Sequence, residues 1–148
     1  MNRGIAIVTA AVFAGSIALA ACAQQMSNVK TYHAALSGSQ EVPAVKTAGT
    51  GTADLKLDTS TKTLTWTVSY SGLSGAAVAA HIHGPNGPMG TNAGVMIPFA
   101  KVGSSPFTGS ATLTDAQIAA LDAGTTYVNI HTAANKGGEI RRQIKAGM

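Results

Sequence analysis

The sequence predicts an all-β protein: an antiparallel β-sandwich or flattened Greek-key barrel with one short helix, preceded by a cleaved signal peptide. Only 11% of the 148 residues are charged and 17 are Gly, while Val and Thr recur in short alternating runs. This profile is typical of sheets rather than helical bundles. The chain is long enough for one domain with its own core. Its clearest strand, residues 63–70, alternates apolar and polar residues and places Trp66 at the centre of the predicted core.

Eight strands are predicted, separated by turns rich in Gly, Pro, Asn and Ser. Their ranges are 31–36, 51–57, 63–70, 76–83, 95–99, 106–113, 126–132 and 139–144. A short helix is expected near residue 115, because Thr114 and Gln117 fit a capping box and Gly124 follows as a stop. The segment 84–94 is expected to form a long loop, since it is rich in Gly, Pro and Asn.

The N-terminus predicts export. Arg3 precedes an apolar run of small residues over 5–19, which is the pattern of a signal peptide and is shorter than a typical transmembrane helix. The four residues Leu19-Ala20-Ala21-Cys22 resemble the lipobox of bacterial lipoproteins. That resemblance implies that residues 1–21 are removed and that Cys22 carries lipid. An ordinary signal peptide cut nearby is the alternative.

The sole cysteine supports the lipoprotein interpretation. Cys22 can form no internal disulfide, and acylation explains its presence in an oxidising compartment. Residues 22–29 are then a lipidated tether and residues 30–146 the globular domain. Ala23 after the acylated residue implies, by the same resemblance, an outer-membrane lipoprotein of the cell envelope that faces the periplasm or the cell surface. The membrane is the expected partner; the leaflet and any protein partner stay open.

Two histidines lie one residue apart at the end of an apolar run. If this run is a strand, His81 and His83 share one face, while Val78, Ala80 and Ile82 share the opposite, core-facing one. The segment 127–131 repeats the pattern, with Asn129 and His131 on one face and Val128 and Ile130 on the other.

A metal site follows if the two strands are neighbours. Cross-strand neighbours on one face lie about 4.5–5.5 Å apart at Cβ, which is close enough for imidazoles to share an ion. Imidazole nitrogens suit copper or zinc, and the affinity series favours copper. His81, His83 and His131 are therefore the predicted metal ligands. The alternative is that they form only a polar strand face.

Four further residues are candidates around such a site. Met89 and Met96 could add a soft ligand for reduced copper, although packing or exposure explains either Met as readily. His33 is predicted to project from the polar face of the first strand and is a candidate fourth imidazole ligand. Asn129 is expected to hydrogen-bond a neighbouring loop or imidazole and so to orient it.

Other functions find little support. The net charge is +4, but the basic residues are scattered and aromatics are only 5%, so we expect no nucleic-acid partner. No Gly-x-Ser-x-Gly elbow or phosphate-binding glycine motif occurs. Glu41 and Glu139 are expected to cap turns or pair with basic residues rather than to perform acid-base chemistry. We do not expect an enzyme.

Four motifs resemble those of the CHRD (chordin-type) domain family and occur in the family's order. They are Leu36-Ser37-Gly38-Ser39-Gln40-Glu41-Val42-Pro43, Ala80-His81-Ile82-His83-Gly84-Pro85, Tyr127-Val128-Asn129-Ile130-His131-Thr132 and Gly138-Glu139-Ile140-Arg141. The likeness covers residues 31–144. It departs at Lys136, where the family often has Pro, and at Arg142, where Gly is common. The resemblance implies an antiparallel β-sandwich or flattened barrel but no settled activity for bacterial members, so function has to be argued from the site.

A more distant likeness concerns copper-zinc superoxide dismutase, whose copper is held partly by a His-x-His strand and a His on a later strand. His81, His83 and His131 match that arrangement in order. The sequence has no His-rich loop with an Asp for the adjoining zinc, and no disulfide. We therefore do not expect dismutase activity.

Two hypotheses of different classes remain. The first is a lipid-anchored envelope protein that binds copper, with zinc as the alternative, and serves in metal buffering, handover or resistance. The second is a non-catalytic adhesion or scaffold module whose loops, 84–94 and 133–138, contact another protein or a polysaccharide.

Overall fold

The computed structural model describes residues 28–86 and 90–147. The predicted signal peptide, the predicted lipidation site Cys22 and the candidate ligand Met89 lie outside these residues. The first strand begins at Val29, one residue before the predicted start of the domain. Of the helices in this part of the chain, none has the length and hydropathy that a bilayer crossing requires.

All eight predicted strands are present, and the last is divided in two. Within the described residues the elements are β1 (Val29–Ser37), η1 (Gly38–Gln40), β2 (Thr50–Asp58), β3 (Thr63–Ser71), β4 (Ala77–His83), β5 (Val95–Pro98), β6 (Phe107–Thr112), α1 (Asp115–Asp122), β7 (Tyr127–Thr132), β8 (Ile140–Gln143) and β9 (Lys145–Ala146). The predicted strand 139–144 ends early because the backbone of the fully buried Ile144 bonds to Thr126 instead, and β9 then pairs with β1.

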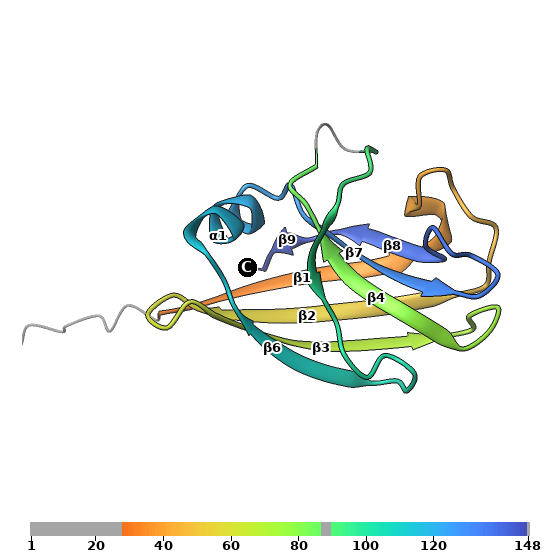
Figure 1. Ribbon diagram of the computed structural model, residues 1–148, viewed down its shortest axis with the longest axis horizontal. Helices are drawn as coiled ribbons and strands as arrows, with labels where there is room; N and C mark the ends of the chain where they lie inside the picture. The colour runs from red at the N-terminus through yellow and green to blue at the C-terminus, as the bar shows by residue number, and fades with distance from the viewer. Residues whose placement is uncertain (1–27, 87–89, 148) are drawn as a thin grey trace, which may run out of the picture.

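The strands form one antiparallel sheet that curls into a nearly closed barrel (Figure 1). Its order is β5-β4-β7-β8-β1-β2-β3-β6, with β9 attached to β1. The predicted all-β fold with one helix is therefore confirmed. β1 and β2 pair over their full lengths, whereas β8 and β1 share a single pair, Ser37 with Arg141. The sheet order places β4, β7 and β8 side by side, and these three strands carry the site described below.

The core contains the predicted tryptophan. Trp66 is 6% exposed and packs against Phe99, with 4.6 Å between ring centroids. Gly109, its partner on β6, leaves room for the indole, because a Cβ at Gly109 would lie 2.6 Å from the ring. Phe107 lies 5.7 Å from Phe99. Since Phe99 follows β5 and Phe107 begins β6, these aromatic contacts connect the two edge strands.

One strand departs from its predicted alternation. Val78 was expected to face the core with Ala80 and Ile82, but it is 58% exposed while Ala77 is buried. The pairing of β4 with β7 shifts between Ala77 and Ala79. A β-bulge places an extra residue in one strand and reverses the faces before it. The prediction for Val78 is therefore wrong, whereas the phase from Ala79 to His83 is kept.

The helix begins as its sequence predicts. The Thr114 hydroxyl accepts from the Gln117 amide, and the Gln117 side chain accepts from the Thr114 amide, which completes the capping box. At the other end of α1, Asp122 accepts a hydrogen bond from Tyr32 Oη at 2.5 Å and pairs with Lys30 at 2.7 Å. These contacts fix the helix to the first strand.

Candidate metal centre

The strands β4 and β7 pair in the register that the histidine pattern requires. Their core-facing residues are all fully buried: Ala80, Ile82, Val128 and Ile130. His81 pairs with Asn129, and Ala79 pairs with His131. Directly paired residues of an antiparallel sheet share a face. His81, His83 and His131 therefore lie together on the face that points away from the hydrophobic core, as the sequence predicts.

The three imidazoles are in contact with one another. His81 Nδ1 lies 3.0 Å from His131 Nε2. The ring centroid of His81 lies 5.2 Å from that of His83 and 4.9 Å from that of His131. His83 and His131 are 8% and 9% exposed, and His81 is half-buried. One side of the cluster is thus closed by protein, while access is left beside His81.

Two backbone carbonyls fix the tautomers of two histidines. His83 Nδ1 lies 2.9 Å from the Ala93 oxygen, and His131 Nδ1 lies 2.9 Å from the Lys136 oxygen. A carbonyl oxygen only accepts, so in both rings Nδ1 carries the hydrogen and Nε2 keeps its lone pair. Metal-binding histidines are usually oriented in this way by a hydrogen bond from their other nitrogen.

One of these lone pairs has no partner. His83 Nε2 is buried and makes no hydrogen bond within the described residues. A buried polar atom left unpaired costs about 1–3 kcal/mol, so such atoms are rare and call for an explanation. A bound metal ion would supply the missing interaction.

The electrostatics keep two of the rings neutral. Burial, assisted by the neighbouring His131 and His83, lowers the pKa of His81 to about 4. Burial is also the main reason why the pKa of His83 is lowered, against the opposing effects of the Ala93 carbonyl and the Asn129 side chain. Neutral imidazole is the form that binds metals, because a protonated ring has no free lone pair.

The cluster fits a metal ion after small rotations. One ligand atom from each histidine lies within 4.8 Å of the others. Nitrogen ligands bind zinc at about 2.0–2.1 Å, so two of them can be no more than about 4.1 Å apart. The 3.0 Å pair already satisfies this limit. The other ligand atoms lie up to 4.8 Å apart, so the side chains have to rotate toward one another before the cluster can hold a metal ion.

Two residues that sequence reasoning missed support His83. The Tyr127 ring is stacked on the imidazole, with 4.8 Å between centroids and 3° between planes. Arg141 Cζ lies 3.4 Å from the centroid of the same tyrosine ring. The guanidinium donates to Asn92 Oδ1 and to the Thr91 oxygen, both at 2.7 Å. It thereby holds the loop whose Ala93 carbonyl orients His83. Both residues stand in the quoted motifs, and strand alternation alone would have put Tyr127 on the histidine face.

The two glutamates differ. Glu139 is fully buried and accepts hydrogen bonds from side chains or backbone of Thr47, Ser74, Thr132 and Asn135. Burial acts to raise the pKa of Glu139, but hydrogen bonds from Ser74, Thr132 and Thr47 outweigh it and lower the pKa to about 2. Burial instead raises the pKa of Glu41 to about 7, although Arg141 and the Val42 amide oppose the rise. Glu139 holds the turn that presents the Lys136 carbonyl to His131.

The other candidate ligands in the described residues, His33 and Met96, make contacts elsewhere, whereas Asn129 contacts a loop beside the cluster. His33 is on β1, and its Nδ1 lies 2.8 Å from Asp54 on β2. The sheet order puts β8 between β1 and β7, so His33 is not brought to the cluster. Met96 is half-buried and packs against the hydrophobic core. Asn129 is 2% exposed and donates to the Gly137 oxygen at 3.4 Å.

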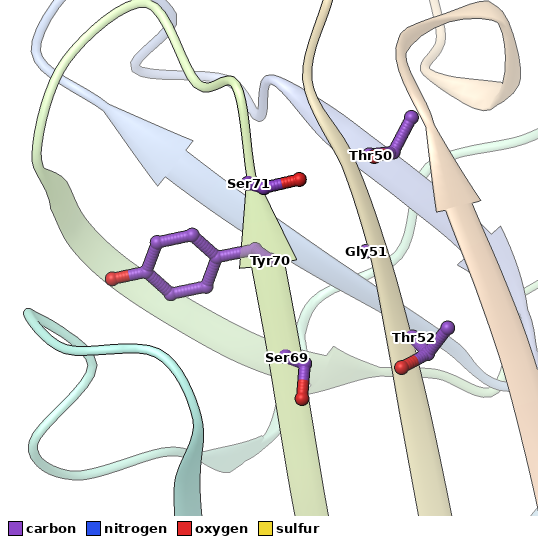
Figure 2. A pocket seen from close by; sticks show the side chains of 6 residues that line it. All are labelled: Thr50, Gly51, Thr52, Ser69, Tyr70 and Ser71. Atoms are coloured by element: carbon purple, nitrogen blue, oxygen red, sulfur yellow. The ribbon is translucent and has the colours of Figure 1, made fainter.

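A separate hollow lies at the ends of β2 and β3 (Figure 2). It has a volume of about 380 Å³ and is lined by Thr50, Gly51, Thr52, Ser69, Tyr70 and Ser71. Figure 2 shows short hydroxyl side chains around the hollow and the Tyr70 ring directed to one side. The lining offers no imidazole, thiol or carboxylate, so the histidine cluster is the better candidate for metal chemistry.

Comparison with known protein families agrees with the resemblance that the four motifs indicate. The family model described as the CHRD domain matches residues 32–144. No curated protein and no solved structure matches the chain. The likeness to copper-zinc superoxide dismutase therefore stays a prediction from the order of the ligands. The family match spans most of the sequence and includes every strand that carries the site, and on this ground the chain belongs to the CHRD domain family.

Proposed function

We propose that this protein binds copper through His81, His83 and His131, and that it serves in metal buffering, handover or resistance rather than in catalysis. One observation carries the proposal: the unpartnered, buried Nε2 of His83 lies in a cluster with two other imidazoles. Backbone carbonyls accept the Nδ1 hydrogen of His83 and of His131, which leaves the lone pair of each ring on Nε2. Among divalent metals, copper has the highest affinity for such nitrogen sites, and zinc is the alternative.

Copper titration of the full chain tests this function. All proteins in the experiment carry Cys22→Ser, because a free thiol would bind copper by itself. We expect one equivalent of copper to bind and His83→Ala to abolish binding while the circular dichroism spectrum is kept. His33→Ala is the matched control, since it removes an imidazole from another part of the sheet and should change nothing. Indifference of the unaltered site to copper and zinc would refute the proposal and favour the adhesion or scaffold hypothesis.

We further propose that the domain is anchored in the cell envelope through lipid on Cys22. The support is the lipobox-like sequence and the absence of any second cysteine in the chain. Mass spectrometry of the mature protein from bacterial membranes tests it. The expected N-terminal residue is a diacylated or triacylated Cys22. A free Cys22 thiol, or cleavage at another bond, would contradict the anchor.

A further inference from the structure

Asn129 presents a second buried atom without a partner at the same site. Its side chain is 2% exposed, and Oδ1 makes no hydrogen bond within the described residues. Asn129 pairs directly with His81 across β4 and β7, so its side chain leaves the sheet on the histidine face. The carboxamide also lies close enough to His83 to interact with it.

Contacts on the side away from the imidazoles fix the orientation of the Asn129 carboxamide. Nδ2 donates to the Gly137 oxygen at 3.4 Å. The position that a Cβ of Gly138 would take lies 2.6 Å from Asn129 Nδ2 and also in contact with Glu41 Oε1, so a carboxyl oxygen lies on the same side. A flipped amide would set Oδ1 against these two acceptors. The observed orientation therefore turns Oδ1 away from them and toward the imidazoles.

Two acceptors thus meet at this point without a donor. His83 Nε2 has no hydrogen, because Nδ1 donates it to the Ala93 carbonyl. Asn129 Oδ1 never has one. Two lone pairs that face one another in a buried site repel, unless a cation or a hydrogen-bonded water lies between them.

We propose that Asn129 is the fourth ligand of the metal and binds it through Oδ1. This inference rests on the proposed function and defines its donor set as three imidazole nitrogens and one carboxamide oxygen. Successive carbonyls of one turn then orient the two ligands of β7, since Lys136 accepts from His131 and Gly137 from Asn129. Because an oxygen donor suits harder ions, the site should prefer copper(II) or zinc(II) to copper(I).

Pulsed electron paramagnetic resonance of the copper(II) protein in D2O tests the assignment. The full chain with Cys22→Ser is compared with the same chain carrying Asn129→Leu, which has a similar volume and no donor atom. We expect Asn129→Leu to gain a deuterium signal from a coordinated water, and to bind copper(II) about tenfold more weakly or worse. Its copper(I) affinity should change less. An unchanged deuterium signal and copper(II) affinity would overturn the proposal.

Two further variants make the result specific. Asn129→Asp supplies an anionic oxygen at the same place and should bind copper(II) more tightly than Asn129→Leu, without the added water signal. It also tests the assignment if Asn129→Leu does not fold. An anionic ligand should bind copper(II) more tightly than a neutral carboxamide, so an affinity equal to that of the unaltered site would exclude residue 129 as a ligand. Asn86→Leu is the control: Asn86 is 8% exposed, but its Oδ1 is already bonded to Gln143 at 3.0 Å. A matching spectral change in Asn86→Leu would indicate general distortion and refute the assignment.

The outcomes separate this inference from the proposed function. If the unaltered site binds no copper, the proposed function fails and the ligand assignment fails with it. If copper binds and His83→Ala abolishes binding, but the Asn129 variants leave the spectrum and affinity unchanged, only the fourth ligand is refuted.

Discussion

Strands β3 and β7 follow the same alternation of apolar and polar residues, yet their polar faces have different surroundings. In β3 the polar residues Thr65 and Thr67 are exposed. In β7 all six residues are buried, including Asn129 and His131. Water satisfies polar groups on the open face, whereas on the covered face each polar atom needs a partner in the protein or in a ligand. The covered face is therefore where residue identity is strongly constrained.

Two segments cover the histidine face of β4 and β7, and we call them the cover: the end of the loop before β5 and the 133–138 turn. Arg141 holds Thr91 and Asn92, next to the Ala93 carbonyl that orients His83. Glu139 accepts from Ser74 and Asn135 and so holds the 133–138 turn beside His131. Two of the buried atoms without a hydrogen-bond partner in the described residues, His83 Nε2 and Asn129 Oδ1, lie within this closed arrangement. At this location a bound metal ion could supply the interactions that both atoms lack.

The largest effect is expected from the carboxylate that holds the cover together. Glu139→Ala leaves donors from Thr47, Ser74 and Thr132 without their acceptor in a buried site. Each buried donor left unpaired costs about 1–3 kcal/mol, so the three together should cost at least about 3 kcal/mol. Urea unfolding of the metal-free protein should show this loss in the free energy of unfolding. On the open region, Asp54→Asn should cost far less; equal losses for the two variants would contradict the comparison.

A smaller loss is expected where the cover leaves no room for one more carbon. Gly138 has a φ of +127°, and a Cβ there would meet Asn129 Nδ2 at 2.6 Å and Glu41 Oε1. Gly138→Ala should therefore lower stability by about 1–3 kcal/mol and weaken copper binding through Asn129. Gly75 has open space around it, so Gly75→Ala is the matched control. Thermal unfolding and copper titration check both variants, and a neutral Gly138→Ala would show that the close packing is unimportant.

Stability should depend on pH because of a second buried carboxyl group, that of Glu41. Burial raises the pKa of Glu41 to about 7 from a usual value of 4.5. The folded protein then binds this proton more tightly than the unfolded chain, so the contribution of Glu41 to stability is full below pH 4.5 and is lost as the pH rises to about 7. Glu41→Gln should therefore gain stability relative to the unaltered protein over this range.

Urea unfolding at a series of pH values measures that gain, with the metal removed. Gln40→Ala changes no charge and should give a curve parallel to that of the unaltered protein. The lowered pKa of His81, about 4, acts in the opposite direction, because its contribution is lost as the pH falls from 6.5 to about 4. The difference between the Glu41→Gln and unaltered curves isolates the carboxyl. A difference that does not change with pH would refute the raised pKa.

The face on which each strand residue lies could mostly be predicted from the sequence, but the surroundings of that face could not. A period of two residues suffices to place His81, His83 and His131 on one face, because alternation in a strand is a property of the backbone. The bulge before Ala79 was not visible, since Val78 is as apolar as its neighbours and only the pairing with β7 sets its face. His33 shows a second limit: its local pattern is also polar outward, but the sheet order leaves it two strands away from β7.

The supporting contacts had the weakest sequence signal. The carbonyls of Ala93 and Lys136 orient two imidazoles. Every residue has a backbone carbonyl, so the sequence does not mark the ones that do this. Arg141 stands in a recognised motif, but its stacking on Tyr127 depends on the pairing of β7 with β8. Such contacts depend on tertiary geometry, which is why the ligands were predicted and the groups that hold them were not.

The smallest expected effect comes from the open face. Thr67 is exposed on β3, so Thr67→Val exchanges a hydroxyl that water satisfies for a methyl group that fits a strand equally well. We expect a change in stability of no more than about 0.5 kcal/mol. Thr132→Val on β7 makes the same exchange where the hydroxyl donates to Glu139 at 2.6 Å, and should cost about 1–3 kcal/mol. Urea unfolding measures both; if the two variants lost the same stability, the covered and open faces would not differ in the way their hydrogen bonds indicate.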